Sequence, residues 1–125
     1  MVEDRIQVGA GHMPTLGLGL WKLPEQSVAS TVVDAVAAGY RHVDSAADYG
    51  NEEAVGEGLR QVLKTTDVVR DDLWVTSKLW NTFHRPEHVR AACERSLRDI
   101  GLDYLDLYLI HFPIALTYVD FSDRY

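Results

Sequence analysis

The sequence contains one cysteine, Cys93, in 125 residues, which excludes a disulfide within the chain and suits a reducing compartment. Basic residues are few and scattered, and the net charge is −7, so nucleic-acid binding is not expected. No apolar run approaches the roughly 18 residues of a membrane span. The N-terminal residues lack the apolar segment of a signal peptide. We therefore expect a cytoplasmic protein that binds neither nucleic acid nor membranes.

What the chain does contain is an ordinary globular composition, with 46% apolar and 25% charged residues. The length suffices for one domain with its own core, and no linker or low-complexity tract divides it. Periodicity predicts a hairpin and then strands alternating with helices. The hairpin is expected at 6–14, the strands at 16–20, 41–44, 73–78 and 105–110, and the helices at 24–38, 51–64 and 86–100.

The expected helices each carry an apolar stripe and recognisable ends. The first stripe is Val28, Val32, Ala35 and Val36, the second is Val55, Leu59, Val62 and Leu63, and the third is Val89, Cys93, Leu97 and Ile100. Asn51 is expected to cap the second helix, and Glu52 and Glu53 suit its positive end. Gly39 and Gly101 suit the positions just past two helix ends.

This alternation is typical of an α/β protein with a parallel sheet and helices packed outside it. The sequence pattern is compatible with two arrangements of such a sheet. A doubly wound open sheet could be complete in 125 residues. A (β/α)8 barrel needs about 250 residues, so the chain would supply only its first half, ending at about strand 4.

Three ionisable residues stand at the ends of the expected strands. Asp44 ends the second strand, Lys78 the third, and His111 follows the fourth; they are spaced by 34 and 33 residues, about one strand-plus-helix unit. Parallel strands place such residues at one edge of the sheet, where βα units carry their chemistry. Tyr49, five residues after Asp44, can reach the same edge.

These four side chains suit protonation of an oxyanion as it forms. An ammonium beside a phenol stabilises the phenolate, so a tyrosine next to Lys78 becomes a useful general acid. A carboxylate such as Asp44 holds the lysine charged and directs it, and His111 can orient a carbonyl oxygen by a hydrogen bond. The sequence has no evident nucleophile–base pair and no cluster with metal-ligand spacing, so we expect no metal site.

Four separated segments give the chain a resemblance to the N-terminal half of the aldo-keto reductases. The segments are Gly17–Lys22, Gly39–Glu52, Thr76–Asn81 and Leu105–Pro113. The resemblance implies the first half of a (β/α)8 TIM barrel with an N-terminal hairpin. It also implies that residues 1–125 are the N-terminal part of one oxidoreductase domain, with no second domain. Such an enzyme reduces an aldehyde or ketone with NADPH, NADH being possible.

The resemblance also implies roles for individual residues. Tyr49 is similar to the proton donor, Lys78 and Asp44 to the pair that tunes it, and His111 to the group that orients the carbonyl. Gly19, Leu20, Trp21 and Asp44 are implied to contact the cofactor. The substrate pocket is implied to include Trp21, Asp48, Trp80, His111 and Phe112.

Asp48 and the segment after His111 point to a substrate class. The tail from Phe112 to Tyr125 is similar to that of xylose reductases and related aldose reductases. A carboxylate at the pocket mouth could accept hydrogen bonds from sugar hydroxyls. We therefore hypothesise a sugar aldehyde, such as the pentose xylose, as the preferred substrate.

Two other functions are open on the sequence alone. Lys78 could form a Schiff base in a barrel aldolase, although that role needs a neutral lysine and Asp44 argues against it. The chain could also belong to a non-catalytic nucleotide-binding barrel. Because strands and loops that complete the cofactor site in the family are absent, we expect the isolated chain to be inactive, with its first and fourth strands as open sheet edges.

Overall fold

A computed structural model describes residues 4–123. A two-stranded antiparallel hairpin opens the chain and a four-stranded parallel sheet follows, in the order β3-β4-β5-β6. The strands are β1 (Arg5–Val8), β2 (Gly11–Pro14), β3 (Leu18–Gly19), β4 (His42–Asp44), β5 (Trp74–Leu79) and β6 (Leu107–Ile110). The helices are α1 (Glu25–Ala37), α2 (Glu52–Thr65) and α3 (Pro86–Ile100), with short 3-10 turns η1 (Ala47–Tyr49), η2 (Arg70–Asp72) and η3 (Asn81–Phe83).

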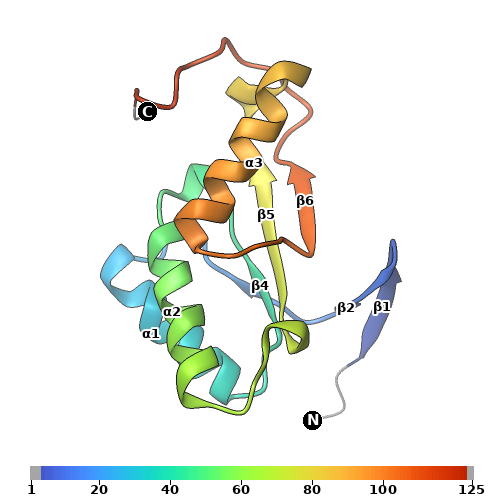
Figure 1. Ribbon diagram of the computed structural model, residues 1–125, viewed down its shortest axis with the longest axis vertical. Helices are drawn as coiled ribbons and strands as arrows, with labels where there is room; N and C mark the ends of the chain where they lie inside the picture. Colours follow the sequence, from blue (N-terminus) through green and yellow to red (C-terminus); the bar gives the residue numbers. More distant parts are fainter. Residues whose placement is uncertain (1–3, 124–125) are drawn as a thin grey trace.

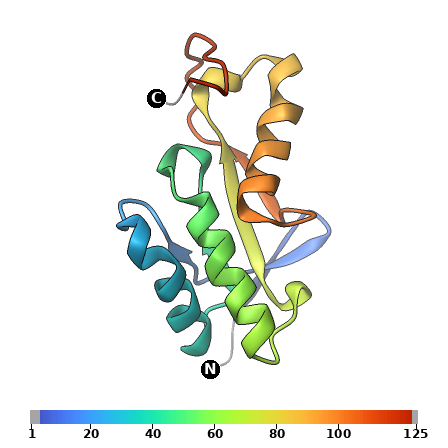
Figure 2. The ribbon, with the colours of Figure 1, turned by 60° about the vertical axis from the view of Figure 1, so that its left-hand side comes forward.

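All three helices cover one face of the parallel sheet, as Figures 1 and 2 show. The main core fills the space between this helix-covered face and α1 and α2. The predicted stripe of α1 is confirmed, since Val28, Val32, Ala35 and Val36 are its buried residues. Val55, Leu59 and Val62 of α2 are buried against them, with Leu63 partly buried. Apolar burial on this face thus holds the helices against the sheet.

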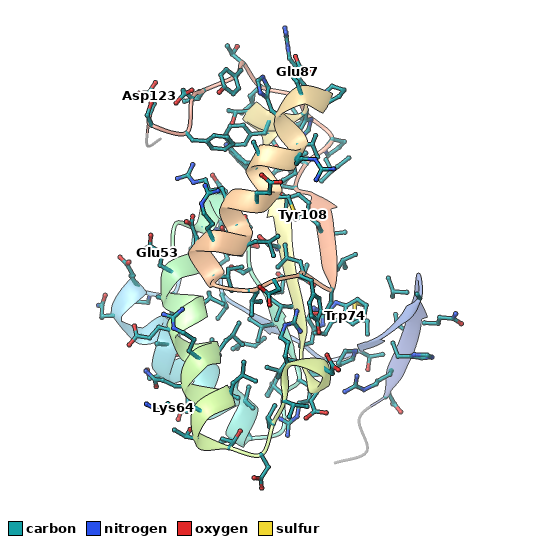
Figure 3. The ribbon with its side chains drawn as sticks, in the orientation of Figure 1. Glu53, Lys64, Trp74, Glu87, Tyr108 and Asp123 are labelled. Atoms are coloured by element: carbon teal, nitrogen blue, oxygen red, sulfur yellow. The ribbon has the colours of Figure 1, made fainter. Side chains whose placement is uncertain are left out.

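The hairpin packs on the opposite face, at the start of the strands. Trp74 lies between β5 and the hairpin (Figure 3) and is only 6% exposed. A side chain on Gly11 would meet the Trp74 ring at 2.7 Å, so close packing here depends on that glycine. His42 on β4 donates through Nδ1 to the Pro14 carbonyl at 3.2 Å. The carboxyl ends of the strands are left clear of the hairpin.

Several predicted details differ from the structure. The strand expected at 16–20 is reduced to Leu18–Gly19. Asn51 occupies the cap position of α2 but makes no capping bond; its side-chain amide donates to the Leu20 carbonyl at 3.1 Å. On α3 the predicted stripe is confirmed in part, since Ile100 is buried and Val89 is partly buried against the core. Ala92 and Ser96 are buried where the prediction had Cys93 and Leu97, which are half-buried.

The sheet has two open edges in the described part of the chain, β3 and β6. The β6 edge exposes apolar side chains, with Leu109 40% and Ile110 65% exposed. The prediction of parallel βα units preceded by a hairpin is confirmed. Over residues 4–123, none of the helices combines the length and apolar character that crossing a membrane requires.

Candidate active site

The three ionisable residues predicted at the strand ends do meet at one edge of the sheet. β4 pairs with β5 and β5 with β6, all in parallel register. Lys78 Nζ lies 2.8 Å from Asp44 Oδ1, with the Lys78 side chain 12% and the Asp44 side chain 35% exposed. This ion pair is therefore shielded from solvent more than an ordinary surface pair, which strengthens the attraction between its charges.

The Lys78 amine has three oxygen acceptors. It donates to Asp44 Oδ1 at 2.8 Å, to the Ser45 carbonyl at 2.7 Å and to the Tyr49 hydroxyl oxygen at 3.1 Å. A lysine ammonium has three N–H donors, so this set matches it fully. The arrangement holds the amine against the phenol and fixes its direction. It leaves no lone pair for attack on a carbonyl carbon.

Tyr49 reaches this edge because the loop after β4 turns sharply. The segment 47–49 forms the turn η1, and Gly50 follows with φ of 69°, in the left-handed region that glycine adopts without strain. Ser45 N donates to the Thr76 carbonyl at 2.9 Å, which pins the start of the loop to β5. The phenol is thus held by backbone on both sides.

His111 completes the predicted group of four. Its backbone N–H donates to the Leu79 carbonyl at 3.1 Å, which continues the β5–β6 pairing by one residue. Its ring lies edge-on to Tyr49, with centroids 5.7 Å apart. Burial, and next the positive charge of Lys78, lower the pKa of His111 from its usual value of 6.5, while Asp48 and Asp44 oppose this. A neutral imidazole is therefore favoured at this edge.

Two of the predicted pocket aromatics pack around His111. Trp80 lies edge-on at 5.3 Å between ring centroids, and Phe112 stacks at 4.8 Å with 48% of its surface exposed. Trp21 is placed differently. Its indole is 64% exposed, and its ring contact is with the Lys22 amine at 4.5 Å. The structure therefore gathers Tyr49, His111, Trp80 and Phe112 into one aromatic group and leaves Trp21 on the open surface.

Asp48 faces a cavity of about 680 Å³ beside this group. Trp80 also lines the cavity, but Asp44, Tyr49, Lys78 and His111 do not. This cavity is therefore adjacent to the predicted catalytic residues and does not contain them. Asp48 is still near enough to His111 to act on its charge.

The segment predicted to contact a cofactor is divided between the surface and the core. A side chain built on Gly19 would meet nothing within 4 Å, so open space lies beside this residue, whose register partner is Asp44. Leu20 is different, because its side chain is fully buried in the core. Its N–H donates to the Asp44 carbonyl and its carbonyl accepts from Asn51. The side chain of Leu20 therefore has no access to a ligand at the edge.

Sequence reasoning missed one polar group next to the site. Glu52 is buried and accepts hydrogen bonds from Ser77 at 2.6 Å and Ser96 at 2.9 Å. The sequence showed Glu52 only as an acid in the first turn of a helix, as it showed Glu53. No group of three or more His, Cys, Asp or Glu side chains suited to a metal ion occurs among residues 4–123.

The chain belongs to the aldo/keto reductase family, whose family model matches residues 5–121. An NADPH-dependent aldose reductase of Saccharomyces cerevisiae, GRE3, is 52% identical over 113 residues, covering 90% of this chain and 35% of that protein. An NADPH-dependent D-xylose reductase of Meyerozyma guilliermondii is 49% identical over 121 residues, covering 96% and 38%. The chain therefore spans little more than a third of the length of these relatives.

Solved structures give the same result for the fold. The aldose reductase from Schistosoma japonicum matches with a TM-score of 0.85 and 48% identity, over 88% of this chain and 36% of that one. A Bombyx mori aldo-keto reductase in complex with NADP matches with a TM-score of 0.88 and 41% identity, over 92% and 40%. The hairpin and four parallel strands are therefore part of a (β/α)8 barrel, and the prediction of this fold is confirmed.

Proposed function

We propose that the complete protein carrying this sequence reduces an aldehyde or ketone to the alcohol with NADPH, and that residues 1–125 form the N-terminal part of its catalytic domain. The observation that supports this most directly is the Lys78 amine, 3.1 Å from the Tyr49 hydroxyl and 2.8 Å from Asp44. Membership of the aldo/keto reductase family supports it independently.

In this proposal Tyr49 donates a proton to the carbonyl oxygen as negative charge develops there. The Lys78 ammonium, 3.1 Å away, stabilises the phenolate that remains. Asp44 pairs with the amine and aims it at the phenol. His111, with its lowered pKa, supplies a neutral imidazole that hydrogen-bonds the carbonyl oxygen and does not compete with Tyr49 for the role of acid.

The nicotinamide is proposed to lie at the edge of the sheet beside Asp44. The open space at Gly19 and the exposed indole of Trp21 are the observations that fit a flat ring at this place. When bound, the cofactor supplies the hydride that reduces the carbonyl carbon. Gly19, Trp21 and Asp44 would contact it, and Leu20 would contribute through its backbone, which links Trp21 to β4 and α2.

We propose a sugar aldehyde such as xylose as the substrate. Trp80 and Phe112 supply an apolar wall around His111, and Asp48 supplies a carboxylate in the adjacent cavity that Trp80 also lines. Sugar hydroxyls can donate to such a carboxylate, and sugar C–H faces pack on aromatic rings. Two of the similar proteins are named as aldose and xylose reductases, which is consistent with this choice.

The Schiff-base aldolase is disfavoured by the surroundings of Lys78. A Schiff-base lysine must be neutral to attack a carbonyl, and desolvation without a carboxylate partner achieves this. The Lys78 amine instead has three acceptors, one of them the Asp44 carboxylate. These contacts occupy all three N–H groups of the Lys78 ammonium and aim it at oxygen atoms of the protein.

The proposal is tested by replacing Tyr49 with phenylalanine in the complete protein. Tyr49→Phe keeps the ring but removes the proton donor, so NADPH-dependent reduction of xylose and of an aromatic aldehyde should both fall by about 10²-fold or more. Tyr40→Phe, in the same family segment but before β4, is the control. Unchanged turnover in Tyr49→Phe would refute the assignment of the proton donor.

A further inference from the structure

Glu52 is a buried acid that the proposed reaction does not use. It is 6% exposed, whereas its neighbour Glu53 is exposed on the same first turn of α2. Burial raises the pKa of Glu52, and hydrogen bonds from Ser77 and Ser96 lower it in part. Burying a carboxyl is costly unless its oxygens are hydrogen-bonded, so the two serine hydroxyls are needed to keep it inside.

One of these serines is the chain neighbour of Lys78. Successive side chains of a strand point to opposite faces, so Ser77 faces the helices while Lys78 faces Asp44 and Tyr49. The bond from Ser77 Oγ to Glu52 Oε1 is 2.6 Å long. It therefore attaches β5 to the start of α2 at the point where Lys78 emerges.

The same glutamate also ends the loop that carries Tyr49. Glu52 lies three residues after Tyr49, and between them Asn51 donates to the Leu20 carbonyl at 3.1 Å. A rigid attachment at Glu52 thus holds the far end of the loop, as the Ser45–Thr76 backbone bond holds its start. The Glu52 side chain therefore connects β5, which carries Lys78, to the end of the loop that carries Tyr49.

We propose that Glu52 is a positioning residue that sets the contact between Tyr49 and Lys78 through its hydrogen bond with Ser77. The inference rests on the proposed function for its kinetic consequence. The placement of Lys78 against Tyr49 that it predicts can be measured in the protein without substrate. Glu52 is buried and is not among the groups proposed to contact substrate or cofactor, so it acts on catalysis only by placing the two reacting groups.

The two serines provide a matched pair for the test. Ser77 adjoins Lys78, whereas Ser96 lies on α3 and adjoins no residue of the proposed site. Each replacement by alanine removes one bond to the same carboxylate, so both should lower the melting temperature. Ser77→Ala should also lower kcat about tenfold with KM changed less than about twofold, since misplacing reacting groups acts on the chemical step. Ser96→Ala should leave kcat at the wild-type level.

A second measurement does not depend on turnover. Nuclear magnetic resonance of the lysine ammonium groups reports how fast their protons exchange with water. The Lys78 ammonium, held by three acceptors, should exchange slowly in the wild type and in Ser96→Ala, and faster in Ser77→Ala. Glu52→Gln keeps the shape and one acceptor oxygen, so its Lys78 ammonium should exchange at a rate between those of the wild type and Glu52→Ala. In Glu53→Gln the exchange rate should match the wild type.

The outcomes separate this inference from the proposed function. If the wild type reduces no carbonyl compound, the proposed function fails, and the exchange measurement still decides whether Glu52 positions Lys78. If Ser77→Ala and Ser96→Ala lower kcat equally, or if Ser77→Ala leaves both kcat and ammonium exchange unchanged, Glu52 only stabilises the fold and the inference is overturned.

Discussion

Lys78 Nζ lies 3.1 Å from the Tyr49 hydroxyl, although the two residues are 29 positions apart and come from different elements. The amine also lies 4.8 Å from the centroid of the Tyr49 ring. An ammonium in this place stabilises the phenoxide more than the phenol. The contact therefore joins the fold to the chemistry we propose.

Lys78→Met should remove most of the activity of the complete protein. The variant keeps an unbranched side chain but leaves Tyr49 without its cation and Asp44 without its partner. We expect kcat to fall about 10²-fold or more. Lys64→Met, in the last turn of α2 and exposed, is the control and should keep normal turnover. A rise in KM with unchanged kcat would show that Lys78 only binds substrate.

Asp48→Ala should discriminate between substrates. The carboxylate beside Trp80 can accept hydrogen bonds from sugar hydroxyls, which an aromatic aldehyde lacks. The variant should therefore lose about tenfold or more in kcat/KM for xylose, equivalent to one charged hydrogen bond, and much less for an aromatic aldehyde. Steady-state kinetics with both substrates measure the difference. Equal losses on the two would end the proposal of a sugar-binding carboxylate.

The sequence was informative about apolar faces and strand ends. The spacing of Val28, Val32, Ala35 and Val36 predicted which side of α1 is buried, because a helix that packs on one side repeats its contacts every 3.6 residues. The recurrence of Asp44, Lys78 and His111 after one βα unit predicted their meeting, because parallel strands end at the same edge. Both predictions could be made without knowing how far each helix is displaced along the sheet or along its neighbouring helix.

The buried polar contacts could not be predicted in this way. Glu52 and Glu53 look alike in the sequence, and only the position of α2 against β5 and α3 decides that Glu52 meets Ser77 and Ser96. The same lateral position brings Ser96 into the core and leaves Cys93 and Leu97 of the predicted α3 stripe only half-buried. Asn51 likewise donates to the Leu20 carbonyl and makes no capping bond to its own helix.

Gly56→Ala should destabilise the protein strongly. A side chain on Gly56 would lie 2.1 Å from the backbone oxygen of Ile100, so α2 and the end of α3 would have to separate. Overpacking of this kind costs about 1–3 kcal/mol or more, which exceeds the gain of about 1 kcal/mol in helix propensity. Chemical denaturation measures the loss. The adjacent exposed variant Glu57→Ala is the control, and equal stability of the two would contradict the close contact.

The protein should become less stable as the pH falls, because the pKa of His111 is lowered in the folded state. Its pKa is lower in the folded protein than the usual 6.5, through burial and the charge of Lys78. As the pH falls through that value, the unfolded chain takes up the proton first, so stability present above pH 6.5 is progressively lost down to the lowered pKa. Urea unfolding at a series of pH values should give a shallower acid slope for His111→Gln. His12→Gln on β2 is the matched control, and an unchanged slope in His111→Gln would contradict the lowered pKa.

The isolated 125-residue chain should show no NADPH-dependent turnover on any aldehyde. It spans little more than a third of the length of its relatives, so the groups that complete a cofactor site would have to come from outside it. Its β6 edge also leaves Ile110 65% exposed, and an open apolar edge favours association with other chains. We therefore expect concentration-dependent light scattering from the isolated chain and, with the complete protein as the positive control, no oxidation of NADPH. A measurable rate from the isolated chain would show that these four strands alone hold both cofactor and substrate.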